Sequence, residues 1–251
     1  MAIGYLETGT SASDRIQNTA PVAAYSTGNF EWIGCVALPN WEPSGSLASA
    51  CGHHRGQISV RVRSAANAGD PSRLQTLYHN GTSQIELNPG SSGTLPDGLV
   101  ANQWVWIRFV FNPNNGANLV HSYYYSLDSE TTDPASVSWT QIGTTVTTTI
   151  DTVRAATSAV AGVGGDSTMT GSNPNNARFA VARLILDGTT IHSPDLRDDD
   201  QGWSSPPATD SQANEWAFNG AATWEPDTGK LVGRSIHYDF ANKQVVIESG
   251  V

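Results

Sequence analysis

The chain is poor in lysine and holds no long run of apolar residues. Lysine occurs only at Lys230 and Lys243, and the formal net charge is −10. An acidic surface repels nucleic acid and anionic lipid, so both are excluded as partners. No segment approaches the roughly 18 apolar residues of a membrane helix, and the first residues lack a secretory signal. We therefore do not expect membrane insertion. We expect that the chain is made in a cytoplasm, unless a secretory signal has been removed.

Cysteine is also scarce. Cys35 lies in an apolar segment, and Cys51 lies beside His53 and His54, in what we interpret as an exposed loop. A four-ligand zinc site needs a second closely spaced Cys or His pair, which the sequence lacks. Two small buried or idle thiols are the better interpretation, and a disulfide between Cys35 and Cys51 is left open.

Helix-favouring runs of Glu, Lys and Leu are missing, whereas Gly, Thr, Ser, Asn and Pro are abundant. About a dozen strand-like segments separated by turns predict an all-β protein, an antiparallel two-sheet β-sandwich of the jelly-roll type. The predicted strands cover residues 30–38, 57–63, 73–78, 83–87, 104–111, 119–127, 137–149, 159–165, 179–186, 189–191, 215–224, 236–240 and 244–247. We expect an N-terminal arm over 1–19, the sandwich over 20–225, and a C-terminal hairpin or assembly extension over 226–251.

Alternation along two strands predicts which residues face the core. In residues 57–63 the inward set is Ile58, Val60 and Val62, with Ser59, Arg61 and Arg63 on the other side. In residues 104–111 the inward set is Val105, Ile107, Phe109 and Phe111, with Trp104, Trp106, Arg108 and Val110 on the other side.

The segment from Tyr123 to Gly143 is interpreted as a β-hairpin. Its arms are rich in residues that fit a pleated surface, and its middle is Ser, Thr, Asp and Pro. In the second arm Val137, Trp139 and Gln141 share one face. A hairpin of this kind needs a larger sheet to cover its apolar face, and the remaining strands supply one.

The predicted elements occur in an order that resembles a known family. The matching segments are Phe30 to Leu38 with Trp41, Trp104 to Arg108 before an Asn-Gly turn, Tyr124 to Asp128 leading to Trp139 to Gly143, Gly162 to Gly165, and Phe179 to Gly188. They resemble the laminin G-like, concanavalin A-like jelly roll, and more narrowly its form in bacteriophage minor tail proteins. The resemblance implies a virion protein of the tail or particle surface, made in the host cytoplasm, that contacts other virion proteins as a homo-oligomer.

The same fold houses glycoside hydrolases, which need two carboxyl groups about 5 Å apart for retaining hydrolysis. The sequence has no strand with alternating acidic residues. Glu225-Pro226-Asp227 contains a proline that disfavours a central strand, and Asp128-Ser129-Glu130 falls where a turn is expected. We therefore expect no enzymatic activity, with a β-glucanase-like hydrolase as the alternative that involves Glu225.

Carbohydrate binding fits the residues better, because sugars stack on exposed aromatic faces. The candidates are Trp41, Trp106, Tyr124 and Trp203. Trp106 and Tyr124 lie in predicted strands and would reach a ligand only if their sheet face is open, whereas Trp41 and Trp203 lie in loops. For each, packing against protein is the competing interpretation.

Calcium is common in this fold, so the resemblance implies a structural Ca²⁺ site at Asp166 or Asp187, with Asp128 and Asp198–Asp200 as further acidic residues. Ordinary turn-forming or solvated aspartate is the alternative interpretation. The leading hypothesis is a non-enzymatic virion protein with a lectin-like module that contacts host envelope glycans. A stand-alone lectin is the second hypothesis.

Overall fold

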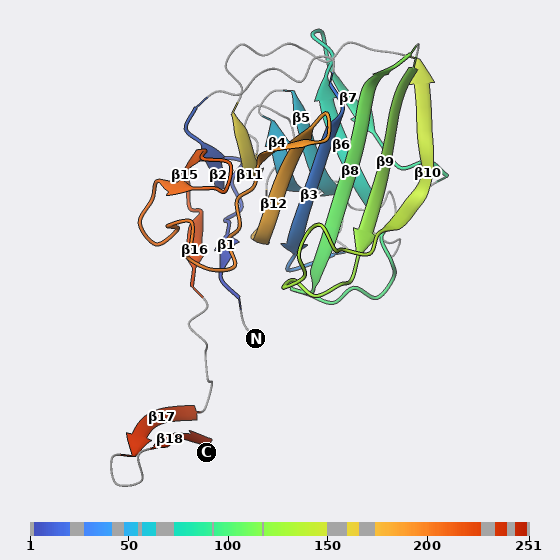
Figure 1. Ribbon diagram of the computed structural model, residues 1–251. Coiled ribbons are helices and arrows are strands. Elements are labelled where there is room, and N and C mark those ends of the chain that lie inside the picture. The colour runs from blue at the N-terminus through green and yellow to red at the C-terminus, as the bar shows by residue number, and fades with distance from the viewer. Residues whose placement is uncertain are drawn as a thin grey trace.

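The computed structural model describes residues 3–20, 28–41, 48–54, 57–63, 73–91, 93–116, 118–149, 160–165, 174–226, 234–239 and 244–249. Two antiparallel sheets of eight strands each form the main body (Figure 1). The predicted all-β, two-sheet antiparallel sandwich is confirmed. Among the described residues, no helix has the length and hydropathy of a membrane span.

Sheet A is the layer nearer the viewer in Figure 1. In spatial order its strands are β10 (Thr140–Thr149), β9 (Asn118–Ser126), β8 (Trp104–Asn115), β3 (Phe30–Ala37), β12 (Arg178–Leu186), β1 (Tyr5–Glu7) and β16 (Thr223–Glu225), and β13 (Thr189–His192) also pairs with β12. The predicted hairpin is confirmed, since β9 and β10 pair antiparallel with Tyr124 opposite Gln141. Its second arm begins only at Thr140, so Val137 and Trp139 precede the strand.

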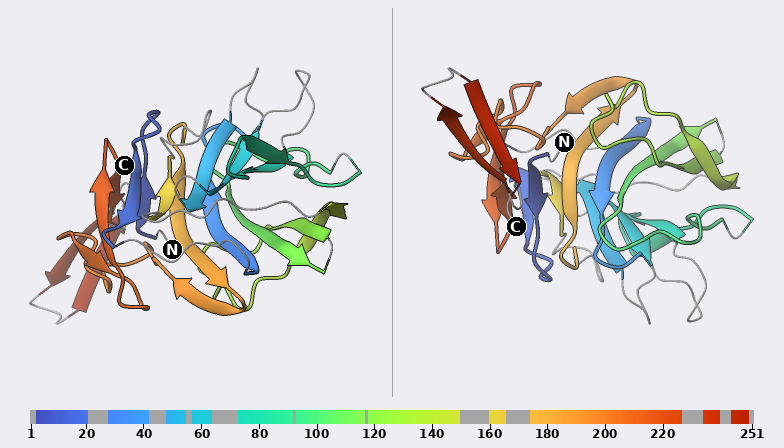
Figure 2. Two further views of the ribbon diagram at one scale, coloured as in Figure 1. Left: turned by 90° about the horizontal axis from the view of Figure 1, so that it is seen from above. Right: turned by 90° about the horizontal axis from the view of Figure 1, so that it is seen from below.

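Sheet B forms the second layer, which the end views in Figure 2 show across from sheet A. Its strands in spatial order are β14 (Ala208–Thr209), β15 (Glu215–Asn219), β2 (Arg15–Asn18), β11 (Ala161–Gly164), β4 (Ala48–His54), β5 (Ile58–Arg63), β6 (Arg73–His79) and β7 (Gln84–Leu87). A further pair, β17 (Arg234–Asp239) and β18 (Gln244–Ser249), makes a separate two-stranded sheet, as predicted for the C-terminal hairpin.

The core lies between the two sheets and follows the predicted alternation. The inward residues of β8 and β5 are all buried in one apolar cluster that also takes in Phe30, Trp32 and Tyr123 of sheet A. On the other side of β5, Ser59 and Arg61 are buried as well, so that side is not an open polar face. Burial of this shared apolar surface from both sheets is the main favourable contribution to folding.

The N-terminal segment is not an arm. β1 pairs with β12 and β16 in sheet A, and β2 pairs with β11 and β15 in sheet B. Both strands therefore lie inside the sandwich. The polar composition of residues 1–19 hid these strands, because of the described residues 3–19 only Leu6 and Ile16 belong to the apolar core between the sheets.

Two other expectations are corrected. The single strand predicted over residues 215–224 is two strands, β15 in sheet B and β16 in sheet A, because the chain turns at Gly220 with φ of +65°. Cys51 lies in β4 and not in a loop. It and Cys35 are both buried, and neither forms a disulfide. Burial raises the pKa of the Cys51 thiol to about 12.

Candidate functional site

The outer face of sheet A is built of residue rows that run across the strands. Strand pairing places Gln141, Tyr124, Arg108, Ile33 and Arg183 side by side across β10, β9, β8, β3 and β12. We call these five residues the open row. A second row on the same face passes through Trp106, two residues before Arg108 on β8. We call it the covered row, and it is formed by Ser126, Trp106, Cys35 and Val181.

The covered row is sealed from solvent. Trp106, Cys35 and Val181 form a second apolar cluster with Ile33 and Val137, separate from the core between the sheets. The indole Nε1–H of Trp106 donates to the carbonyl of Ser129 at 3.0 Å. Burial raises the pKa of the Cys35 thiol well above its ordinary value. This row is therefore structural packing beneath the segment that joins β9 to β10.

The joining segment, residues 127–139, holds its shape through its own side chains. The Asp128 carboxylate accepts the backbone N–H of Ser138 at 2.6 Å, and the Asp133 carboxylate accepts that of Ala135 at 2.8 Å. Backbone bonds from Thr132 to Ser129 and from Ser136 to Asp133 close two tight turns. Short Ser and Asp side chains favour such turns because they replace a backbone partner. Asp128 thus closes the base of the loop.

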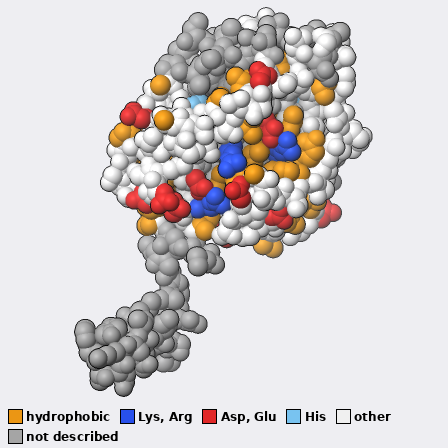
Figure 3. Space-filling model, in the orientation of Figure 1, with side chains coloured by type: hydrophobic (Ala, Val, Ile, Leu, Met, Phe, Trp, Pro, Cys, Tyr) orange, Lys and Arg blue, Asp and Glu red, His pale blue; other side chains and the backbone are white. Residues whose placement is uncertain are grey.

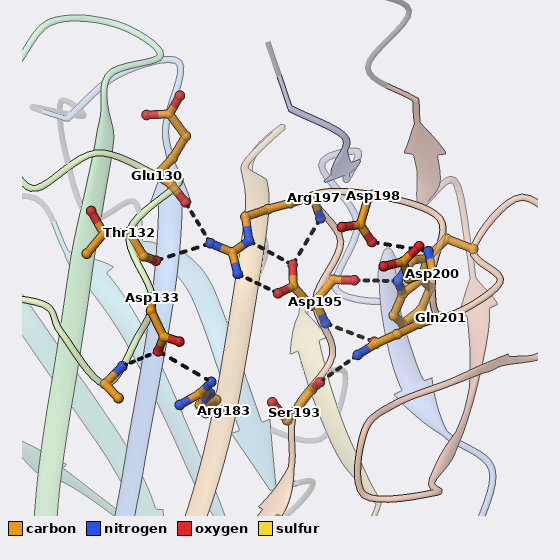
Figure 4. A network of polar contacts seen from close by, with 12 residues as sticks. Glu130, Thr132, Asp133, Arg183, Ser193, Asp195, Arg197, Asp198, Asp200 and Gln201 are labelled. Carbon is orange, nitrogen blue, oxygen red and sulfur yellow. Dashed lines mark hydrogen bonds and ion pairs between the residues drawn. The ribbon is translucent and has the colours of Figure 1, made fainter. Parts of the chain in front are cut away.

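A second loop, residues 193–207, meets the first over the covered row, and Arg197 joins them (Figure 4). Its guanidinium donates to both carboxylate oxygens of Asp195, at 2.8 and 2.6 Å. It also donates to the carbonyls of Glu130 and Thr132, at 3.3 and 3.1 Å. The hydrogen bonds to Asp195 raise the pKa of Arg197 above its ordinary value. We call this set of contacts the Arg197 clamp.

The second loop is itself fixed to sheet A. Leu196 N–H donates to the carbonyl of Ala180 at 2.8 Å, and the indole of Trp203 donates to the carbonyl of Asp195 at 2.6 Å. The Gln201 side chain accepts the N–H of Asp195 and donates to the carbonyl of Ser193. The Arg197 clamp therefore connects two loops that are each already held by their own hydrogen bonds.

The open row lies beside these loops and carries the side chains best suited to a ligand. Arg108 Nε donates to Glu31 Oε1 at 2.7 Å, and the Arg108 side chain is 30% exposed. Its guanidinium carbon lies 5.3 Å from the ring centre of Tyr124 and 5.7 Å from that of Trp139. Such cation–π contacts hold the guanidinium in place. Figure 3 shows basic side chains near the middle of this face, with acidic and hydrophobic ones around them.

Arg183 extends the row toward β12. Its Nη2 lies 3.9 Å from Oδ1 of Asp133, a long ion pair with a carboxylate whose side chain is 67% exposed. Ile33 separates Arg183 from Arg108 in the row. The half-buried Ile185 lies two residues along β12 from Arg183, opposite Glu31. The arrangement combines two aromatic rings, two guanidinium groups, two carboxylates and an apolar floor.

The structure places three of the four predicted sugar-stacking aromatics in the interior. Trp41 is 2% exposed, Trp106 0% and Trp203 1%. Their ring faces contact protein, so they do not form a stacking surface here, and this corrects their assignment. Tyr124 is half-buried beside Arg108 on the open row, so it alone of the four lies at a candidate site.

Sequence reasoning missed Arg108, Trp139 and Glu31 as members of the site. Arg108 is two residues from Trp106 and shares its predicted face, so strand alternation placed it on the correct side. Trp139 shares its predicted face with Gln141, which the register puts opposite Tyr124. Alternation could therefore have suggested the cluster, but not which part of the face the loops leave open.

Where the structure describes them, the acidic residues proposed for calcium or hydrolysis do not gather. Asp187, at φ of +48° in the β12–β13 turn, accepts the N–H of Asn29 at 2.7 Å, and Asp166 lies outside the described residues. Glu225 is exposed at the end of the edge strand β16. Within the described ranges, no three His, Cys, Asp or Glu side chains form a group that could hold a metal. A calcium site therefore remains a prediction.

No protein-family model and no curated protein matches the chain. Among solved structures, the exoplasmic/lumenal domain of VIP36 in a Ca²⁺/Man2-bound form has a TM-score of 0.40 at 12% identity, covering 86% of this chain and 85% of that one. An engineered GH43 glycoside hydrolase with endo-xylanase and exo-arabinofuranosidase activity has a TM-score of 0.35 at 15% identity. That match covers 63% of this chain, which spans 29% of the hydrolase.

Scytalido-glutamic peptidase, bound to a transition state analog inhibitor, has a TM-score of 0.20 at 8% identity, with 98% of this chain and 97% of that chain covered. These likenesses are distant, with TM-scores of 0.40 or below. The chain is therefore described by its own architecture, a two-sheet antiparallel β-sandwich with one outer face partly covered by loops.

Proposed function

We propose that the chain is a non-enzymatic, lectin-like module that binds a neutral saccharide on the open row of sheet A. The observation that carries this proposal is the Arg108 cluster, in which Glu31, Tyr124 and Trp139 hold one guanidinium in place. Saccharide sites combine aromatic rings, which pack against C–H faces, with a few fixed polar groups that bond to hydroxyls.

The hydrogen-bonding capacity of Arg108 supports this proposal. Its Nε–H is taken by Glu31, and the described residues offer no acceptor for its other N–H groups. A guanidinium has five N–H donors in a fixed fork, which suits adjacent sugar hydroxyls. Since its rotamer is already set by three neighbours, binding costs less side-chain entropy than ordering a free arginine.

The charge balance of the face favours a neutral sugar over an acidic one. Arg108 is paired with Glu31, and Arg183 faces Asp133, so each cation has a carboxylate near it. The chain as a whole carries a formal net charge of −10, which disfavours an anionic ligand further. Neutral hexose polymers of a cell envelope match this chemistry.

An array of immobilised saccharides tests the proposal. The wild-type chain should bind at least one neutral saccharide, and Tyr124→Ala and Trp139→Ala should each lose most of that signal. Tyr5→Ala is the matched control, because Tyr5 is also stacked by an arginine, Arg178 at 5.0 Å, but on β1 outside the site. An array with no bound saccharide, or equal loss with the control variant, would contradict the proposal.

The absence of hydrolysis is a separate part of the proposal. It is supported by the placement of Glu31, whose carboxylate is engaged by Arg108 and not set beside a second carboxylate among the described contacts. Incubation with β-glucan should release no reducing sugar. Release that disappears in a Glu225→Gln variant would instead support the hydrolase alternative.

The particle setting, a bacteriophage minor tail or surface protein that contacts host glycans, is supported by the order of the sequence segments that resemble that family. It is independent of the saccharide site. Mass spectrometry of purified particles should detect this chain. A particle preparation without it would leave the stand-alone lectin as the better account.

A further inference from the structure

The outermost strands of the two sheets differ in how they are protected from pairing with another chain. β14 has two residues and β16 three, and β7 and β13 have four each. Charge or proline accompanies three of them: Glu86 of β7 is paired with Arg61 and Arg63, β16 ends at Glu225-Pro226, and β14 follows Pro206-Pro207. Short strands, charges and proline are the usual devices that block edge-to-edge association.

β10 has none of these devices. It lies at an outer edge of sheet A (Figure 1), is ten residues long and reads Thr-Gln-Ile-Gly-Thr-Thr-Val-Thr-Thr-Thr. It is exposed at all eight positions other than Ile142 and Val146. That run contains no charged residue and no proline. β-branched residues such as threonine and valine favour strand pairing. A long, uncharged edge of this kind is a template for an added strand.

The hydrogen-bonding pattern shows which part of the edge is open. Thr144 exchanges backbone bonds with Gly90 at 3.2 Å in both directions, so its backbone groups point away from β9. β10 has a register irregularity between Ile142 and Val146, and beyond it alternate residues of the strand direct their backbone groups away from β9. Among the described residues, Gly90 supplies the only backbone partner on this side of β10. Within the part of the chain that the structure describes, the end of β10 beyond Thr144 therefore presents backbone groups without a partner.

The C-terminal hairpin, β17 and β18, is a candidate for the strand that pairs with this edge. β17 and β18 pair over six residues each, and within the described chain neither joins sheet A or sheet B. In the register of the two strands, Ile236 is paired with Ile247 and Tyr238 with Val245. A two-stranded hairpin alone is at best marginally stable in water. It needs a sheet to join.

We propose that the hairpin of one copy of this chain adds to the free edge of β10 in a second copy, through β18, and so extends sheet A of that copy. β18 carries the strand-favouring run Val245-Val246-Ile247 and one charged residue, Glu248, whereas β17 has a charged residue at each end, Arg234 and Asp239. This is β-strand addition between identical chains. Because the donor and acceptor surfaces differ, the contact is head-to-tail and leads to a ring or an open chain of copies.

Light scattering after size-exclusion chromatography tests the proposal on the full chain, whose monomer mass is 26.6 kDa. The full chain should have a multiple of that mass. A chain of residues 1–226, which lacks the hairpin, and a full-length Thr148→Pro variant, in which proline interrupts the strand edge, should each be monomeric. Thr148→Ser is the matched control and should associate like the wild type.

Mixing distinguishes this contact from any symmetric one. The 1–226 chain keeps the β10 edge and the Thr148→Pro chain keeps the hairpin, so together they should form a one-to-one complex. Far-UV circular dichroism checks that each is folded, and Thr148→Lys replaces the proline variant if that variant unfolds. A monomeric full chain, an associated 1–226 chain, or folded variants that fail to form the mixed complex would each overturn the proposal.

Discussion

Trp106 and Tyr124 lie on neighbouring strands of sheet A and on the same outer face, yet their surroundings are opposite. Trp106 is fully buried beneath the 127–139 loop and bonds to Ser129. Tyr124 remains half-buried beside Arg108 and Trp139. Strand alternation therefore assigns a residue to a face of the sheet and no more. The loops that lie over that face decide whether it is core or surface.

The largest expected effect comes from removing the covered member of this pair. Trp106→Ala should destabilise the fold by about 3–5 kcal/mol, because it opens a cavity under the loops and leaves the carbonyl of Ser129 without its hydrogen-bond donor. Trp139→Ala, at the edge of the open row, should cost about 1 kcal/mol. Urea unfolding measures both changes. Equal costs would mean that the two rings are equally buried in solution.

The Arg197 clamp offers a way to open the covered row. Arg197→Met removes the bonds to Asp195, Glu130 and Thr132 and should cost about 1–3 kcal/mol. In a Cys51→Ala background it should also make Cys35 react faster with a thiol reagent, because Cys35 lies beneath the joined loops.

Arg183→Met is the control for the clamp, since its long ion pair with Asp133 should contribute about 1 kcal/mol or less. Reaction of Cys35 that is unchanged in Arg197→Met, or equally fast in both variants, would show that the clamp does not hold the loops closed.

Substitution on the open row should separate binding from stability. Tyr124→Ala should weaken saccharide binding about tenfold or more, which corresponds to about 1.4 kcal/mol, while unfolding changes by about 1 kcal/mol. Calorimetric titration with the saccharide found on the array measures the first, and urea unfolding the second. A variant that binds normally would move the site away from Tyr124.

Acid pH gives the smallest effect and acts on buried residues outside the open row. Burial lowers the pKa of His192 and of His121 below the ordinary 6.5, against a smaller opposing effect of Asp210 on His192. Both ring nitrogens of His192 are buried without a partner among the described residues. The unfolded chain therefore binds more protons than the folded one as pH falls through 6.5, so stability is present above that pH and is lost below it.

Between pH 7 and 6 the loss should reach up to about 0.7 kcal/mol for each such histidine. Urea unfolding across this range measures the slope, and His192→Phe should make it shallower. An unchanged slope in that variant would mean that His192 keeps its ordinary pKa in the fold.

Local patterns predicted much of the fold. The alternation of residues 104–111 placed both faces of β8 correctly, and Asn80-Gly81 and Asp187-Gly188 marked turns that the structure shows with positive φ at Gly81, Asp187 and Gly188. These features depend on neighbours along the chain. They could therefore be predicted without knowledge of distant residues.

Features set by distant residues were missed. β4 reads Ala-Ser-Ala-Cys-Gly-His-His, which has little strand character, but Gly52 in it and Gly34 in β3 make room for the Trp32 indole between the sheets. In the same way, local sequence did not distinguish the buried Trp106 from the half-buried Tyr124. The loop that covers Trp106 is held by the Arg197 clamp, which joins residues more than 60 positions apart. Sequence order alone contains no signal for which loop covers which row.

The indole N–H signals of Trp139 and Trp106 in a two-dimensional ¹H–¹⁵N spectrum test the central claim most directly. Titration with the saccharide that the array identifies should shift the Trp139 signal, because that ring lies against Arg108 on the open row. It should leave the Trp106 signal in place, because that indole is bonded to Ser129 beneath the loop. A shift of Trp106 with Trp139 unmoved, or no shift of either during confirmed binding, would contradict the account.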